Sequence, residues 1–454
     1  MTDMKKDTKD YLIGLDLGTS IIKGVLLDSL GHIHHTASQA VSYLYPQEGW
    51  IEADPQVYRL HVFNVIKQLT KISPISIGAI AMAGASGNTL LTSDDGTPLT
   101  NIINWMDQRT AGQLPKALQG LTSQAVRQVT GWPCVDSFSL AHLAWFREHK
   151  SQQFHAATHC CMNADWILFQ LTGNWILDYS TATPLHLQDQ ITKSYHQPFL
   201  DRLGIAQSTL SKLVPSGFLA GHITPAAAKA TGLSQETKVI TGSFDHPMAA
   251  RAVGVLDPGS LLLSCGTSWV GLFPETSRQK IINAQLLCDP FLESAKGPWA
   301  AMFSIPRIGQ MIDTYVRQII APGESDPYAV FNNEAQAADT DAGGLKIDLR
   351  EPIQHTTQSR KNISRAVMQG TADLLQEKLC ELKNQDIHFT HAVLVGGPSR
   401  SSLWTDIVQT TIGLQLSVGT PYSGAKGAAM LAGIATGVFK DEKDAFNQCE
   451  KTNA

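Results

Sequence analysis

Residues able to hold phosphate stand near the start of the chain, where Asp16-Leu-Gly-Thr-Ser20 separates two short apolar stretches. Glycine lets the backbone approach a ligand closely, and Thr and Ser hydroxyls with consecutive N–H groups form an anion-binding concavity. A carboxylate beside such a cradle is repelled by phosphate unless Mg²⁺ lies between them, so Asp16 is interpreted as a direct or water-mediated metal contact. Lys23 could reach phosphate or could lie at a strand edge, and the sequence favours neither.

A second turn of the same kind, Gly266-Thr-Ser268, follows the apolar stretch 259–264. One such turn in each half of the chain suggests two loops that close on a single nucleotide, although two ordinary hairpins would give the same pattern. Gly396-Gly-Pro-Ser399 joins an apolar stretch to an expected helix, where the helix dipole favours phosphate. Taken alone, this segment also fits a simple strand–helix connection.

A third turn, at 242–246, carries Asp245 near the middle of the chain. An aspartate in such a turn is typical of an Asx turn or a helix N-cap, and the residues alone favour that structural interpretation. A positioned carboxylate is also what phosphoryl transfer to a hydroxyl requires, since that reaction depends more on positioning and charge neutralisation than on covalent chemistry.

The elements that must position these residues recur in two halves. Apolar β-rich stretches predict strands, and apolar spacing of helical period predicts helices, with turns of Gly, Asp and Ser between them. The expected strands are 11–15, 21–27, 32–38, 77–83, 238–241, 259–264, 269–273 and 391–395. The expected helices are 55–71, 140–149, 165–171, 225–231, 247–252, 365–382 and 402–412. Because the order strand, Gly-Thr-Ser, strand occurs twice, we predict a weak internal duplication with a boundary near 242–245.

Composition indicates a soluble globular protein of two large domains. The 454 residues are 43% hydrophobic and 17% charged, with a net charge of −5 and no basic block, which gives no reason to expect a nucleic acid or membrane partner. Seven scattered cysteines without C-x-x-C spacing argue against disulfides and a cysteine zinc site and fit a reducing cytosol, and Cys160-Cys161 is interpreted as a pair of buried thiols. The polar N-terminus does not read as a signal peptide, and a cytoplasmic location is expected.

Segments distributed along nearly the whole chain resemble the FGGY family of carbohydrate kinases. Their order and spacing are specific, although several are weak singly, and they are 16–20, 49–55, 105–109, 165–178, 221–225, 242–254, 262–271, 395–404 and 424–432. The resemblance implies an α/β fold of two actin-like (ribonuclease H-like) domains with an ATP and substrate cleft between them. The domains expected are 1–242, which binds sugar, and 243–454, which binds nucleotide, with ATP and Mg²⁺ as cofactors. A homodimer is expected by the same analogy.

The resemblance also implies roles for individual residues. Asp245 would be the general base that takes the proton of the attacking hydroxyl, and would share Mg²⁺ with Asp16. Asp107 would bind sugar hydroxyls. Gln108 and Arg109 would assist it or be surface residues, and Trp105 would pack beneath the sugar or belong to the core. The ATP-binding residues would be Gly18, Thr19, Ser20, Lys23, Gly266, Thr267, Ser268, Gly396, Gly397 and Ser399.

The sequence departs from the family pattern in the expected sugar pocket. Where many relatives have a Gly-Gln-Met-His-like run, this chain has Gly84-Ala-Ser-Gly-Asn88, so Ala85 and Ser86 would line a roomier wall with fewer hydrogen bonds. Met106 stands where the family usually has asparagine, and the absence of a recognisable Arg-Glu pair argues against glycerol.

The function predicted is phosphorylation of a small sugar or sugar derivative, most readily a ketose such as a pentulose. The alternative is an actin-like ATPase or regulatory sugar-binding protein without kinase turnover. The sequence does not specify which sugar or which hydroxyl.

Overall fold

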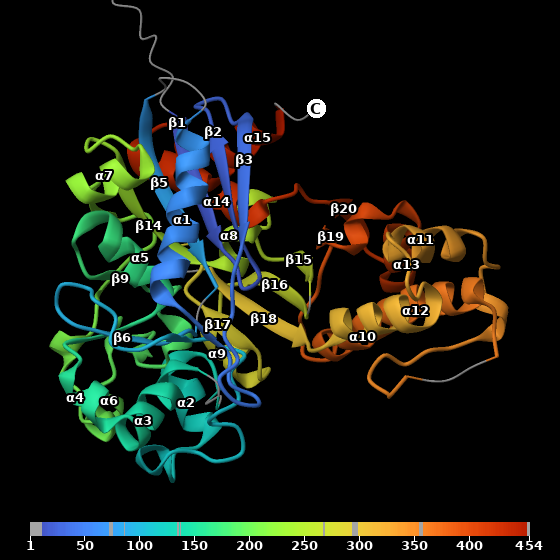
Figure 1. Ribbon diagram of the computed structural model, residues 1–454. Helices are drawn as coiled ribbons and strands as arrows, with labels where there is room; N and C mark the ends of the chain where they lie inside the picture. The colour runs from blue at the N-terminus through green and yellow to red at the C-terminus, as the bar shows by residue number, and fades with distance from the viewer. Residues whose placement is uncertain are drawn as a thin grey trace, which may run out of the picture.

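The computed structural model describes residues 11–71, 76–85, 87–133, 136, 138–266, 268–292, 298–353 and 357–451. Within them the chain forms two six-stranded mixed sheets with helices packed around both (Figure 1). Ser86 and Thr267, two of the predicted site residues, lie outside the described residues.

The first sheet has the strand order β13-β14-β5-β1-β2-β3. Its strands are β1 (Tyr11–Leu17), β2 (Ile21–Leu27), β3 (Ile33–Ala40), β5 (Ile77–Gly84), β13 (Leu219–His222) and β14 (Lys238–Phe244). The β1–β2–β3 meander is antiparallel, whereas β5 and β14 run parallel to β1. The central strand β1 is almost wholly buried, as expected of a strand covered on both faces.

The second sheet repeats this plan in the order β17-β18-β16-β15-β19-β20. Its strands are β15 (Ser260–Cys265), β16 (Trp269–Glu275), β17 (Leu287–Asp289), β18 (Trp299–Ile305), β19 (His391–Gly396) and β20 (Gln415–Val418). Again three strands form an antiparallel meander, and two more run parallel to the first of them. The five-strand cores match strand for strand, so the predicted internal duplication is confirmed.

Fifteen α-helices lie in the described residues, of which seven match the helices expected from apolar spacing and eight were not predicted. They are α1 (Pro55–Thr70), α2 (Ser123–Thr130), α3 (Ser139–His149), α4 (Ser151–Ala156), α5 (Asn163–Thr172), α6 (Gln197–Leu203), α7 (Pro225–Thr231), α8 (Asp245–Ala252), α9 (Arg278–Asn283), α10 (Ile308–Thr314), α11 (Pro327–Gln336), α12 (Arg360–Lys383), α13 (Ser402–Ile412), α14 (Ser423–Thr436) and α15 (Glu442–Lys451). α12 begins five residues before the predicted start because Ser359 caps it, accepting a hydrogen bond from the Asn362 N–H.

Short paired strands lie outside the two sheets. They are β4 (Glu52–Ala53) with β7 (Ile102–Ile103), β6 (Leu90–Thr92) with β8 (His159–Cys161), β9 (Ile176–Asp178) with β12 (Lys212–Val214), and β10 (Gln188–Asp189) with β11 (Ser194–Tyr195). All of them belong to the long insertion between β5 and β14 or to its contacts with the β3–α1 connection. Cys160 and Cys161 of β8 are both buried free thiols, as expected.

One helix of the second half returns to the first sheet. α14 follows β20 yet packs against β1, β5 and α8. The approach is close, since a Cβ at Gly14 of β1 would lie 1.9 Å from the carbonyl oxygen of Ala425 in α14. The division into 1–242 and 243–454 stays a prediction, because the first sheet ends at Phe244 and is covered by a helix from beyond that boundary.

None of the helices in the described part of the chain has the length and apolarity that crossing a bilayer requires.

Candidate active site

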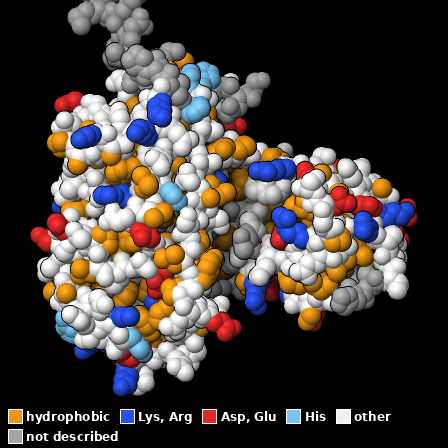
Figure 2. Space-filling model, viewed as in Figure 1, with side chains coloured by type: hydrophobic (Ala, Val, Ile, Leu, Met, Phe, Trp, Pro, Cys, Tyr) orange, Lys and Arg blue, Asp and Glu red, His pale blue; other side chains and the backbone are white. Residues whose placement is uncertain are grey.

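A pocket of about 560 Å³ lies where the two sheets face each other, and both halves of the chain line it. The surface is visibly hollowed between the larger and smaller parts of the molecule (Figure 2). Residues that reach this pocket include Asp16, Lys23, Ser38, Asp245 and His246 from the first half and Ser264, Gly266, Gly396, Ser399 and Arg400 from the second. The structure therefore brings together the turn-forming segments that the sequence singled out.

Asp16 is the penultimate residue of β1, so it belongs to the strand rather than to the turn that follows. The antiparallel register places Lys23 of β2 directly opposite. Burial raises the pKa of Asp16 to about 7, although Lys23 opposes that shift, and the nearby charge of Asp245 raises the pKa further. Two carboxylates close enough to influence each other, in a desolvated pocket, are a suitable oxygen-donor pair for a hard cation.

The N-terminus of α14 also reaches the pocket, through Tyr422, Ser423 and Gly424. Gly424 lies against Asp16, because a Cβ there would be 2.9 Å from the Asp16 carboxylate. A helix N-terminus carries partial positive charge on its unpaired N–H groups, which favours an anionic ligand. The sequence signal for this contribution was the Gly/Ala-rich stretch after residue 423, whose role was not predicted.

Asp245 is the first residue of α8 and follows β14 directly. Its side chain is 29% exposed, which leaves the carboxylate accessible from the pocket, and it accepts a hydrogen bond from the His246 N–H at 2.7 Å. This contact to the next residue is not a helix N-cap, since Phe244 holds the N-cap position and no side chain caps α8, and it occupies one carboxylate oxygen only.

A buried chain of hydrogen bonds supports the backbone just before Asp245. The Phe244 N–H donates to Ser180 Oγ at 3.1 Å, and the Ser180 hydroxyl contacts the Asp289 carboxylate at 2.9 Å. Burial raises the pKa of Asp289 to about 8. Because Asp289 lies on β17 of the second sheet, this chain links the second half of the molecule to the residue that precedes Asp245.

In the second half, the Gly396 turn after β19 has a conformation suited to glycine. Its φ is +105°, and a Cβ there would lie 2.3 Å from the carbonyl oxygen of Cys265. The Ser399 hydroxyl donates to the Gly396 carbonyl at 2.7 Å and so holds the turn closed. Both residues line the pocket, as does Arg400, which sequence reasoning missed.

A second cavity of about 730 Å³ adjoins this pocket and shares Gly266 and Arg400 with it. Aromatic side chains of Trp269, Tyr328 and Trp404 form part of its lining, with Gln310, Asn332 and Asp313 as polar partners. Apolar walls with a few polar groups are typical of sites for flat organic ligands. Gly397 lines this cavity rather than the pocket that Asp16 and Asp245 line, and of the other lining residues only Gly266 was predicted.

The Gly18-Thr19-Ser20 turn is placed differently from its counterpart. Gly18 and Thr19 line a separate cavity of only about 10 Å³, together with Ala85. The indole N–H of Trp105 donates to Thr19 Oγ1 at 3.0 Å. Ser20 is exposed at the tip of the turn. The turn thus lies beside predicted substrate residues. Asp16 and Lys23 are the members of this segment that line the pocket between the two halves.

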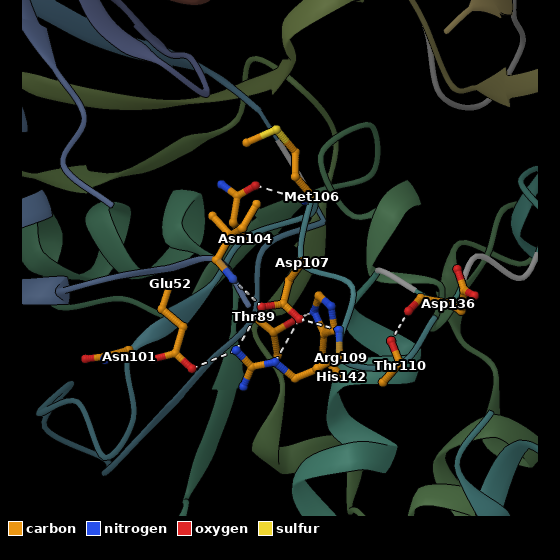
Figure 3. A network of polar contacts seen from close by, with 11 residues as sticks. Glu52, Thr89, Asn101, Asn104, Met106, Asp107, Arg109, Thr110, Asp136 and His142 are labelled. Carbon is orange, nitrogen blue, oxygen red and sulfur yellow. Dashed lines mark hydrogen bonds and ion pairs between the residues drawn. The ribbon is translucent and has the colours of Figure 1, made fainter. Parts of the chain in front are cut away.

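Asp107 lies at the centre of a buried ion-pair network (Figure 3). Its carboxylate accepts hydrogen bonds from the Ile51 N–H at 2.6 Å, from the Arg109 N–H at 2.8 Å and from the Arg109 guanidinium at 2.8 Å. Arg109 also pairs with Glu52 at 2.7 Å and stacks over Trp50, 4.0 Å from its ring centre. Asp107 is 0% exposed, so its oxygens are committed to the protein and face no pocket. Gln108 is exposed nearby.

An aromatic cluster next to Asp245 was not anticipated. Phe244 contacts Trp132 with ring centres 5.5 Å apart, and Phe138 contacts both Trp132 and His186. His186 is fully buried, yet neither of its ring nitrogens has a hydrogen-bond partner among the described residues, and the Trp132 indole N–H has none either. The signal in the sequence was weak, since buried aromatic residues are usually core.

Solved structures share this fold over nearly the full length of the chain. The gluconate kinase from Lactobacillus acidophilus superposes with a TM-score of 0.86 at 22% identity, covering 97% of this chain and 92% of that one. The xylulose kinase from the same organism gives a TM-score of 0.85 at 23% identity, with the same coverage. The fold is therefore a two-domain α/β fold, shared with these structures over nearly the full length of the chain.

The sequence comparisons specify the family. Residues 11–252 match the N-terminal domain, and residues 261–436 the C-terminal domain, of the FGGY family of carbohydrate kinases. The xylulose kinase of Bacillus subtilis is 26% identical over 96% of this chain and 91% of its own length, and the gluconokinase of the same organism is 24% identical over 94% and 88%. The chain belongs to the FGGY family and is a carbohydrate kinase.

Proposed function

We propose that this kinase transfers the γ-phosphoryl group of ATP to a hydroxyl of a small sugar or sugar derivative, most readily a ketose such as a pentulose. The observation that carries the proposal is the pocket in which Asp16 and Asp245 of the first half face Gly396, Ser399 and Arg400 of the second. The similar proteins named xylulose kinase support a ketopentose, and the gluconokinase among them keeps a sugar acid as a competing candidate.

Asp245 would act as the general base. Its carboxylate is accessible from the pocket, and it begins a helix whose preceding residue is tied through Ser180 to the second sheet. A base must be held in reach of the proton that it removes, and this support fixes the backbone at that point. Transfer would then proceed in line, with the sugar oxygen attacking while Asp245 takes its proton.

Asp16 and Asp245 would hold Mg²⁺ between them. The fit rests on the raised pKa of Asp16, which reflects a desolvated carboxylate beside a second negative charge and thus a site where a cation is favourable. When bound, Mg²⁺ supplies positive charge to phosphate oxygens. Lys23, opposite Asp16, is a second cation in the same pocket and would meet the phosphates.

ATP would span both cavities of the cleft. Its phosphates would contact the hydroxyls of Ser264 and Ser399, the backbone at Gly396 and the α14 N-terminus. All of these line the same pocket as Asp16 and Asp245. The adenine ring would occupy the adjoining cavity among Trp269, Tyr328 and Trp404. Gly266 and Arg400, shared by the two cavities, stand where triphosphate and nucleoside would join.

The sugar would lie on the other side of Asp245, towards the aromatic cluster of Trp132, Phe138, His186 and Phe244. The Trp132 indole N–H and the His186 ring nitrogens, which have no hydrogen-bond partner among the described residues, would form hydrogen bonds with substrate hydroxyls. Asp107 would support this region through Arg109 and Glu52 rather than contact the sugar, because its oxygens are already occupied.

A substrate screen tests the proposal. Purified protein with MgATP is incubated with ketopentoses, ketohexoses, aldonates and polyols, and ADP release is measured with and without each compound. We expect turnover to depend on one compound class, with a phosphorylated product visible by mass spectrometry, and turnover at least about 10²-fold lower for Asp245→Asn. ATP hydrolysis without a phosphorylated sugar, or sugar binding without turnover, would instead establish the actin-like ATPase or regulatory alternative. Light scattering checks the predicted homodimer, which remains a proposal.

A further inference from the structure

A group of metal-ligating side chains lies at the opposite end of the β2–β3 hairpin from the ATP pocket. Asp28 follows β2, and His32 and His34 flank the start of β3. The pocket residue Lys23 is five positions before Asp28, which is about 16 Å at about 3.3 Å per strand residue. This Asp28–His32–His34 group is therefore separate from the catalytic carboxylates.

Asp28 is held in place by the turn. Its side chain is 2% exposed, and Oδ1 accepts hydrogen bonds from the N–H groups of Leu30 at 2.8 Å and His32 at 3.0 Å. The other oxygen, Oδ2, faces two imidazoles, with His32 Nδ1 at 3.2 Å and His34 Nε2 at 2.8 Å. One carboxylate oxygen thus fixes the turn, and the other is aimed at two ring nitrogens.

Both histidines are partly exposed, and the ring of one of them also packs against a tyrosine. Their side chains are 46% and 39% exposed, so solvent can reach the face of the group opposite Asp28. The Tyr11 ring packs edge-on against His34 at 5.2 Å and restricts the orientation of that imidazole. Burial tends to raise the pKa of Asp28, but hydrogen bonds from His34, His32 and Leu30 outweigh it and lower the pKa to about 2.

We propose that Asp28, His32 and His34 bind a divalent transition-metal ion, with Zn²⁺ as the best-suited case. One ligand atom from each residue lies within 4.8 Å of the other two. In a tetrahedral zinc site with bonds of about 2.0 Å, ligand atoms are about 3.3 Å apart, so the Oδ2–nitrogen separations need little adjustment. Two imidazoles and a carboxylate suit zinc, whereas Mg²⁺ prefers oxygen ligands.

Three protein ligands leave the fourth position to water on the solvent side. A bound ion would tie the end of β2 to the start of β3, and β3 is the edge strand of the first sheet. The expected consequence is a more stable hairpin end, without any direct contact to the ATP pocket. The competing interpretation is that the same three residues only form a hydrogen-bonded turn.

The test is zinc binding to untagged protein in the absence of nucleotide, followed by competition with a chromogenic chelator and by isothermal titration calorimetry. We expect a saturable site of one zinc per chain that excess Mg²⁺ does not displace. His32→Ala and His34→Ala should each weaken zinc binding at least about tenfold, since loss even of groups that only orient metal ligands costs that much. Circular dichroism confirms that each variant is folded.

His35→Ala is the matched control. His35 is an exposed histidine on the same strand, and it is not one of the residues that converge on Asp28. Zinc affinity should be unchanged in this variant, and zinc should raise the melting temperature of the wild type and of His35→Ala but not of His34→Ala. Absence of a saturable site, or equal loss of affinity in His35→Ala and His34→Ala, would overturn the proposal.

Discussion

The two halves of this kinase are built on the same five-strand plan, yet they bring opposite chemistry to the pocket between them. Asp16 and Ser264 occupy equivalent positions, each two residues before the glycine of a Gly-Thr-Ser turn, and both line the pocket. β14 and β20 are equivalent strands of the two sheets, and the residues that follow them also differ. Asp245 follows β14, whereas Gly419 follows β20. The first half therefore presents acids, and the second presents a hydroxyl and backbone.

This difference suggests how one fold unit, used twice, came to serve a phosphoryl transfer. The carboxylates that the first half contributes to the pocket can hold a cation and accept a proton. The hydroxyl groups, backbone and Arg400 of the second half can surround a polyphosphate without repelling it. The insertions follow the same division. The first half carries the long insertion between β5 and β14 with its aromatic cluster, and the second carries α10 to α12 beside the cavity proposed for adenine.

The Asp245→Asn substitution is the most direct test of whether the first half supplies the proton acceptor. This change keeps the shape of the side chain but removes the proton acceptor, and kcat should fall between about 10²-fold and 10⁴-fold. Nucleotide affinity, followed by fluorescence titration with ADP, should change little because the second half carries most of the proposed nucleotide contacts. Activity within threefold of the wild type, a margin of roughly 0.7 kcal/mol, would show that another group is the base.

The Asp107→Ala substitution tests whether this acid of the first half stabilises the fold, in contrast to the acids proposed to act in catalysis. Removing one partner of a buried ion pair leaves Arg109 uncompensated, so the free energy of unfolding should fall by about 3–5 kcal/mol. Urea denaturation measures this loss. Lys443→Ala, in an exposed pair with Asp257 at 2.8 Å, is the control and should stay within about 0.5 kcal/mol. A stable Asp107→Ala protein with a raised KM for sugar would restore the sugar-binding hypothesis.

The smallest contrast is between Asp16→Asn and Ser264→Ala, at equivalent positions. Because burial raises the pKa of Asp16 to about 7, protons compete with a cation for this carboxylate as the pH falls through 7. At subsaturating Mg²⁺, wild-type activity should therefore rise by about tenfold between pH 6 and pH 8. Asp16→Asn should be weaker throughout and lose that dependence on Mg²⁺ and pH, whereas Ser264→Ala should keep it. Equal pH profiles in the two variants would contradict the assignment of the cation to Asp16.

The strands and helices that were predicted lie near their observed bounds because they depend on local patterns, but β13, β17, β18 and β20 of the two sheets were not predicted. β1, β5 and β19 are short runs of buried apolar residues, and each expected helix has regular apolar spacing. The duplication was also visible, since both meanders contain the same turn. The return of α14 to the first sheet could not be predicted, because its Gly/Ala-rich sequence is compatible with packing on either half.

The site was predictable where chemistry depends on residue type and less so where it depends on burial. Asp16, Asp245, Gly396 and Ser399 were selected from their turns, and all four line one pocket. Asp107 was selected in the same way, but only three-dimensional packing shows that Arg109 and backbone donors use its oxygens. The cavity among Trp269, Tyr328 and Trp404 joins residues far apart in sequence, which no local pattern indicates.

The packing of α14 has a consequence for how this chain could be divided. A fragment ending near residue 252 would include the complete first sheet but would expose the apolar faces of β1 and β5 that α14 covers. Such a fragment should aggregate, or recruit α14 from a separately expressed second fragment. The two halves, although duplicated in plan, are therefore interlocked, and gene fission would yield complementing pieces rather than autonomous modules.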